Sequence, residues 1–165
     1  MKRSKDINII IGIGIFTFLA MSAYWYAWFL APDLVRARTP LDADYAVYIG
    51  YEQAFPLPDA FVTIAAVIGV IGLWNMRDFG FFSMLLSAGG AFFLGLEDLL
   101  YDLQHNMFIP FNGAAAIELA IVLVIMSLGP CMAFLLWKRR REFFKLCQTL
   151  DCESIWRLEC LALTA

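Results

Sequence analysis

The run INIIIGIGIFTFLAMSAYWYAWFLAP, residues Ile7–Pro32, contains no Asp, Glu, Lys or Arg. Its 26 residues exceed the roughly 20 that an α-helix needs to cross the hydrocarbon layer of a bilayer. Its far end holds Tyr24, Trp25, Tyr26 and Trp28, aromatic residues of the kind that anchor a helix at the membrane interface. Since the run is also too long for the apolar region of a signal peptide, we expect a retained transmembrane helix.

Three further uncharged runs follow, and each is bounded by charged residues. They have 17, 18 and 19 residues, at positions 60–76, 79–96 and 119–137. The chain of 165 residues is 62% hydrophobic with a mean hydropathy of +0.72, whereas a soluble domain is about 45–50% apolar. Too little polar sequence remains to cover four core helices in water. We therefore predict an all-α membrane protein, a four-transmembrane-helix bundle with helices at about 7–30, 55–74, 80–103 and 114–137.

The predicted domain organisation is simple. Residues 1–141 are expected to form the transmembrane domain and residues 142–165 a cytoplasmic tail. Residues 41–51, with three tyrosines at three-residue spacing, are expected to form a short segment at the outer interface. The tail has a loose helical stripe of apolar residues beside basic ones. Two interpretations of it stay open, an amphipathic helix on the inner membrane surface or a partly disordered tail.

Basic residues gather in segments that would share one side of a four-span chain. They are Lys2, Arg3 and Lys5, then Arg77, then Lys138, Arg139, Arg140, Arg141 and Lys145. The expected loop at residues 102–113 has no Lys or Arg. The positive-inside rule therefore predicts a multi-pass protein with both termini in the cytoplasm. The net charge of −3 says little about partners, because charge is segregated by side.

Carboxylates gather at the opposite, outer ends of the predicted helices. Charged groups carried into a membrane usually face the bundle interior or water, because one at the centre costs about 2.5–3.5 kcal/mol. With one neighbouring tyrosine they form the predicted ligand-binding set, which is Glu52, Asp59, Glu97, Asp98, Tyr101, Asp102 and Glu118.

Four interpretations of these acids stay open. The plainest is a set of solvated carboxylates at helix ends, where Asp59 also favours the positive N-terminus of its helix. The others are a pocket for a small cationic or amphipathic ligand, a divalent-metal site with His105, and a proton relay. A single histidine without a fixed His or Cys partner is a weak metal motif. Ligand binding at an acidic, outward-facing mouth is the leading functional hypothesis, and we predict no cofactor.

Small residues recur every fourth position along the third predicted helix, at Ser83, Ser87, Ala91 and Gly95. Such a stripe lets helices approach closely in lipid. It predicts either ordinary packing within the chain or a homodimer. The homodimer interpretation supports a second functional hypothesis, a non-catalytic membrane assembly subunit. A third hypothesis, a membrane isomerase or proton-coupled carrier, requires carboxylates along a continuous water path.

Other function classes find no support in the residues. The sequence has no glycine-rich nucleotide loop, no Ser/His/Asp arrangement, no CxxC pair and no nucleic-acid surface. The predicted partners are therefore the lipid bilayer, a small amphipathic ligand and a second copy of the chain, but not nucleic acid.

Glu52–Pro58 reads EQAFPLP, which is the pattern E-x-x-F-x-L-P at the expected start of the second helix. This stretch resembles the emopamil-binding-protein-like group, which includes the sigma-2 receptor. The resemblance implies four helices, cytoplasmic ends and a pocket whose carboxylates hold cationic amines or sterol carbocations, with Glu52 as a pocket acid. The layout is equally similar to uncharacterised small prokaryotic four-helix membrane proteins. The first helix lacks a carboxylate and the second a histidine, which departs from sterol isomerase chemistry.

Overall fold

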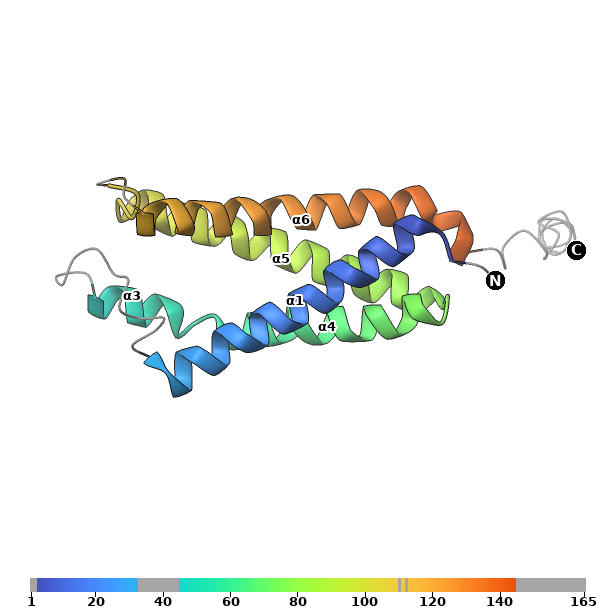
Figure 1. Cartoon of the computed structure of the whole chain (residues 1–165), viewed down its shortest axis with the longest axis horizontal. Helices are drawn as coiled ribbons and strands as arrows, with labels where there is room; N and C mark the ends of the chain where they lie inside the picture. The colour runs from blue at the N-terminus through green and yellow to red at the C-terminus, as the bar shows by residue number, and fades with distance from the viewer. Residues whose placement is uncertain (1–2, 33–44, 110, 112, 145–165) are drawn as a thin grey trace, which may run out of the picture.

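Four long apolar helices pack together in the computed structural model, which describes residues 3–32, 45–109, 111 and 113–144. The helices are α1 (Lys5–Leu30), α3 (Tyr45–Glu52), α4 (Pro56–Trp74), α5 (Asp78–Gln104) and α6 (Gly113–Phe143). Figure 1 shows α4, α5 and α6 running nearly along the long axis, with α1 crossing them obliquely. Four candidate membrane spans, in which α3 and α4 count as one, meet the length and composition of a bilayer crossing. The predicted all-α four-helix bundle is confirmed.

Apolar side chains cover the outside of this bundle as well as its core. A water-exposed surface of this kind would be unfavourable, so these side chains indicate contact with lipid. Examples from all four long helices are more than two-fifths exposed, namely Phe16, Leu19, Ile64, Ile71, Phe82, Phe93, Leu123 and Phe134.

The beginning of α1 lies against the end of α6. Ser4 caps α1 by accepting a hydrogen bond from the backbone N–H of Ile7 at 3.4 Å. Asp6 in the first turn then pairs with Arg139 at 2.8 Å and with Lys138 at 3.4 Å. The described start and end of the chain therefore lie at the same end of the bundle (Figure 1).

A tight turn joins α4 to α5, and glycines let the two helices touch backbone to backbone. Met76 in this turn has a positive φ of 53°, which reverses the chain within three residues. A methyl group added to Gly80 would overlap the backbone of Gly72 and Leu73. Further along, one added to Gly69 would lie 2.9 Å from the backbone nitrogen of Met84. Neither Gly80 nor Gly69 therefore leaves room for a side chain.

The small-residue stripe of α5 packs inside the chain. Ser87 is fully buried and Ala91 is 8% exposed. A methyl group added to Gly95 would lie 3.0 Å from the side chain of Met126 on α6. These residues are therefore already covered by the chain's own helices, as expected from ordinary packing, and the homodimer stays a prediction.

One segment differs from its expected bounds, and two others lie partly outside the described residues. α6 continues to Phe143, beyond the expected end near residue 137, and Pro130 lies within it. The expected interfacial segment is the helix α3, although residues 41–44 are outside the description. Residues 145–165, most of the predicted tail, are also outside it.

The backbone contact between α4 and α5 predicts a strong dependence on Gly80. Replacing Gly80 with alanine should lower the free energy of unfolding by about 1–3 kcal/mol, because the helices must separate. Gly89→Ala on the same helix is the control, since nothing lies within 4 Å of its added methyl group. There, stability should stay unchanged or rise by up to about 1 kcal/mol. Unfolding in mixed detergent micelles measures both; equal effects would contradict the contact.

Candidate functional site

Five helices bring polar side chains to the end of the bundle farthest from the described chain termini. There, α1 ends, α3 lies, α4 begins, α5 ends and α6 begins, at the left of Figure 1. We call the carboxyl groups gathered there the acidic cluster, consisting of Glu52, Asp59, Asp98, Asp102 and Glu118. Each of these side chains is buried or half-buried.

Aromatic donors from the last turns of α1 reach two members of the cluster. The Tyr24 hydroxyl donates to Glu52 Oε2 at 2.8 Å. The Trp25 indole N–H donates to Asp59 Oδ2 at 2.9 Å, and Asp59 is only 6% exposed. Because carboxyl groups removed from water need donors, these two bonds stabilise the acids and fix the end of α1 against α3 and α4.

A stack of three rings links α3 to the end of α5. Tyr51 stacks on Tyr101 with ring centroids 3.8 Å apart and planes 9° apart. Tyr101 stacks in turn on His105 at 4.0 Å. The Tyr51 hydroxyl also donates to Asp98 Oδ1 at 3.1 Å. Tyr51 therefore positions both the stack and one carboxyl group of the acidic cluster.

Asp102 is the most weakly satisfied acid of the cluster. Its side chain is 5% exposed, and its Oδ2 atom accepts no hydrogen bond from the described residues. Glu52, Glu118 and His105 lie close enough to interact with it electrostatically. A buried acceptor without a partner costs about 1–3 kcal/mol. Asp102 Oδ2 is therefore a buried acceptor that receives no hydrogen bond from the described chain and lies close to other acidic groups.

Most of the predicted site residues lie together, with three qualifications. Glu97 is exposed on a different face of α5 from Asp98. Asp59 lies at the edge of the cluster, where Trp25 satisfies it. Tyr101 is 8% exposed and belongs to the ring stack rather than to an open wall.

The metal hypothesis finds no ligand set in the described part of the chain. No group of three or more His, Cys, Asp or Glu side chains there is arranged to hold a metal ion. The His105 ring instead stacks on Tyr101, with Nδ1 3.0 Å from the Tyr101 carbonyl oxygen.

Sequence reasoning missed the inward role of Tyr24 and Trp25. Both were expected as interfacial anchors, but both donate into the acidic cluster. Their pattern contained a usable indication. Tyr24 and Trp25 carry polar hydrogens, and they lie at the same membrane depth as several acids. Donors and acceptors at one depth can pair inside a bundle.

Charge is divided between the two ends of the bundle. Within the described residues, every Lys and Arg lies at the end opposite to the acidic cluster, namely Arg3, Lys5, Arg77, Lys138, Arg139, Arg140 and Arg141. Arg36 and Arg38, which could serve as partners for the acids, lie outside the described residues. The acidic end is therefore suited to attract cations.

Comparison of the chain with protein-family models, with curated proteins and with solved structures finds no match. The class that the fold defines is a multi-pass membrane protein with four candidate spans.

The hydrogen bond from α1 to Glu52 can be tested with a pair of tyrosines. Tyr24→Phe should lower the free energy of unfolding by about 1–3 kcal/mol, because it removes a donor from a part-buried carboxyl group. Tyr26→Phe is the matched control, since Tyr26 is 68% exposed, and should change stability by less than about 0.5 kcal/mol. In a Glu52→Gln background the effect of Tyr24→Phe should shrink. Full additivity of the two substitutions would contradict the bond.

Proposed function

We propose that this membrane protein binds a small cationic, amphipathic molecule at the acidic cluster. The observation that carries the proposal is Asp102, a buried carboxyl group among other acids whose Oδ2 finds no hydrogen-bond partner in the described part of the chain. Burying Asp102 among other acids without a donor is by itself unfavourable for the free energy of folding. A bound cation would donate to Oδ2 and reduce the repulsion among the acids, so binding would stabilise the folded protein.

The chemistry around Asp102 favours an organic cation. Carboxyl groups supply the charge complement, and the tyrosine rings of α3 supply aromatic surface, a combination that recognises ammonium groups. Apolar residues such as Leu100 and Leu103 are exposed nearby on α5, so an alkyl portion of the ligand could remain in contact with lipid. An amphipathic amine satisfies both environments.

The resemblance of Glu52–Pro58 to the emopamil-binding-protein-like group supports the same proposal. In that group carboxylates hold cationic amines, and the resemblance implies Glu52 as a pocket acid. Glu52 is held by Tyr24 and lies close enough to Asp102 to interact with it electrostatically.

We further propose that the acidic cluster faces the outer side of the membrane and that both termini are cytoplasmic. The support is the division of charge, because basic segments are retained on the cytoplasmic side. The described Lys and Arg residues share one end of the bundle.

Cysteine labelling tests this orientation. In a background in which Cys131, Cys147, Cys152 and Cys160 are replaced by serine, Asn106→Cys should react with a membrane-impermeant maleimide in intact cells. Asn75→Cys, in the turn between α4 and α5, should react only after the membrane is permeabilised. The reverse pattern would overturn the orientation but not the binding proposal.

Asp102→Asn tests binding. It should weaken binding of a long-chain primary ammonium compound by about tenfold or more, because a hydrogen bond to a charged group contributes about 1.5–3 kcal/mol. The same substitution should leave the unfolding temperature unchanged or raise it, because it removes a carboxyl group that is buried near other acids. Calorimetric titration in lipid nanodiscs measures the first effect and thermal unfolding the second.

Two controls sharpen this experiment. A neutral compound with the same alkyl chain should bind Asp102→Asn and the unsubstituted protein equally, because it lacks the charge. Glu97→Gln should retain binding within about threefold, since an exposed carboxylate contributes little. Equal weakening by both substitutions, or no preference for the cation, would count against the acidic cluster as a ligand site.

A further inference from the structure

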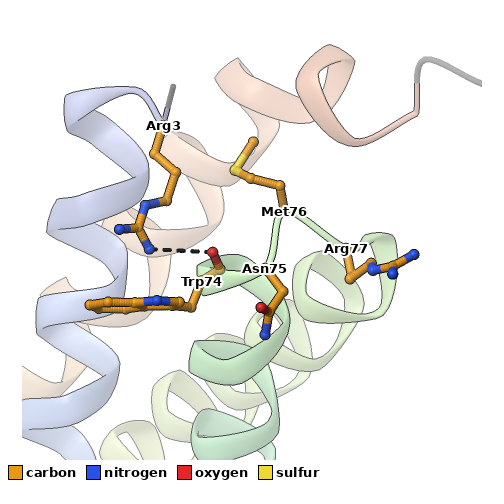
Figure 2. A pocket seen from close by; sticks show the side chains of 5 residues that line it. All are labelled: Arg3, Trp74, Asn75, Met76 and Arg77. Atoms are coloured by element: carbon orange, nitrogen blue, oxygen red, sulfur yellow. Dashed lines mark hydrogen bonds between the residues drawn. The ribbon is translucent and has the colours of Figure 1, made fainter. Parts of the chain in front are cut away.

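A hollow lies at the opposite, basic end of the bundle, between the start of α1 and the turn from α4 to α5. Its volume is about 550 Å³, within the ~300–1,000 Å³ typical of small-molecule sites. Figure 2 shows the side chains that line it, which are Arg3, Trp74, Asn75, Met76 and Arg77. It is independent of the acidic cluster.

Trp74 holds Arg3 in place at this hollow. The Arg3 guanidinium lies 4.1 Å above the centroid of the Trp74 ring, and its Nη1 donates to the Trp74 carbonyl oxygen at 3.3 Å. Figure 2 shows the ring lying flat beneath the guanidinium. Stacking and one hydrogen bond thus orient the group while most of its N–H donors stay available.

The acceptors at the end of α4 are already occupied. A helix C-terminus exposes carbonyl oxygens, which would repel an anion. Here each of the last four carbonyls accepts a hydrogen bond, namely Ile71 from Asn75, Gly72 from Arg77, Leu73 from Met76 and Trp74 from Arg3. The carbonyl oxygens at this helix end are therefore already hydrogen-bonded, three by the turn and one by Arg3. Arginine N–H groups remain available beside the hollow.

Arg3 and Arg77, the two arginines that line this hollow, have no carboxylate partner among the described residues. The ion pairs found in the described chain join Asp6 to Lys138 and Arg139, and Arg139 to Glu142. Asp78, next to Arg77, accepts a hydrogen bond from the N–H of Phe79 instead. Figure 2 shows Arg77 extending from the turn on the side away from Trp74. The residues that line the hollow include two arginines and no acid, and this positive charge favours an anion.

We propose that this hollow binds the phosphate group of an anionic phospholipid. Phosphate matches the donor geometry of arginine. The lipid is favoured over a soluble phosphate because Trp74, 58% exposed, is typical of the membrane interface. Basic hollows between transmembrane helices at the membrane surface are typical sites for acidic lipid headgroups. The acyl chains would lie along the exposed apolar faces of α1 and α4.

Native mass spectrometry of the detergent-solubilised full chain tests the proposal. We expect one phosphatidylglycerol molecule to be retained in preference to phosphatidylcholine of the same acyl chains. Arg3→Gln should reduce this retention about tenfold or more, because a charge-assisted contact is lost. Arg77→Gln should reduce it likewise, and it keeps the test valid if Arg3→Gln does not fold.

Arg140→Gln is the matched control. Arg140 also lies over a tryptophan, 4.4 Å above the Trp137 centroid, and donates to that residue's carbonyl at 2.8 Å. It does not line the hollow. In micelles without a charged lipid surface its loss should change retention by about threefold or less. Equal losses for Arg3→Gln and Arg140→Gln would overturn the site in favour of general surface attraction.

Competition distinguishes a lipid from a free anion. Inorganic phosphate and glycerol 3-phosphate at millimolar concentration should leave the bound phosphatidylglycerol in place, because neither supplies acyl chains. Displacement by either compound would overturn the lipid assignment and identify the hollow as a site for soluble phosphates. Equal retention of phosphatidylcholine would overturn recognition of negative charge altogether.

Discussion

Carboxyl groups that are buried inside a membrane-spanning helix bundle have to find hydrogen-bond donors in the same chain, because lipid offers none. This requirement organises one end of the molecule. α1 supplies the donors through Tyr24 and Trp25, and α3 supplies another through Tyr51. Asp102 is the member for which the described chain provides no donor at Oδ2. The same requirement that holds this end together is therefore left unmet at one carboxyl oxygen, where we propose that a ligand binds.

The remaining contacts place α1 so that it can meet this requirement. At the other end, Asp6 ties α1 to Arg139. Between the two ends, Gly14 packs against Met84 and Val70, so α1 lies close to α4 and α5. The contact of Gly72 with Gly80 aligns α4 and α5 independently of any polar group. Polar contacts at both ends and close packing between them thus fix one arrangement of helices.

The sequence was sufficient to predict the four helices, because uncharged runs of transmembrane length are a direct consequence of the bilayer thickness. It also predicted that Glu52, Asp98, Asp102 and Glu118 would gather, since in an up-and-down bundle the end of one helix lies beside the start of the next. It could not show that Glu97 turns outward, because the rotation of α5 about its axis depends on packing against α4 and α6. The donors for the acids were missed for a related reason. An interfacial aromatic residue can face lipid or protein, and only the crossing of α1 directs Tyr24 and Trp25 inward.

Photoaffinity labelling tests the central claim most directly. A long-chain ammonium compound with a diazirine beside its charged group would be irradiated with the protein in lipid nanodiscs, and the labelled residues would be located by mass spectrometry. The account predicts labels on α3 and on the last two turns of α5 around Asp102, all displaced by excess unlabelled ammonium compound. Labels confined to the lipid-facing midsections of the helices, or unaffected by the competitor, would contradict it.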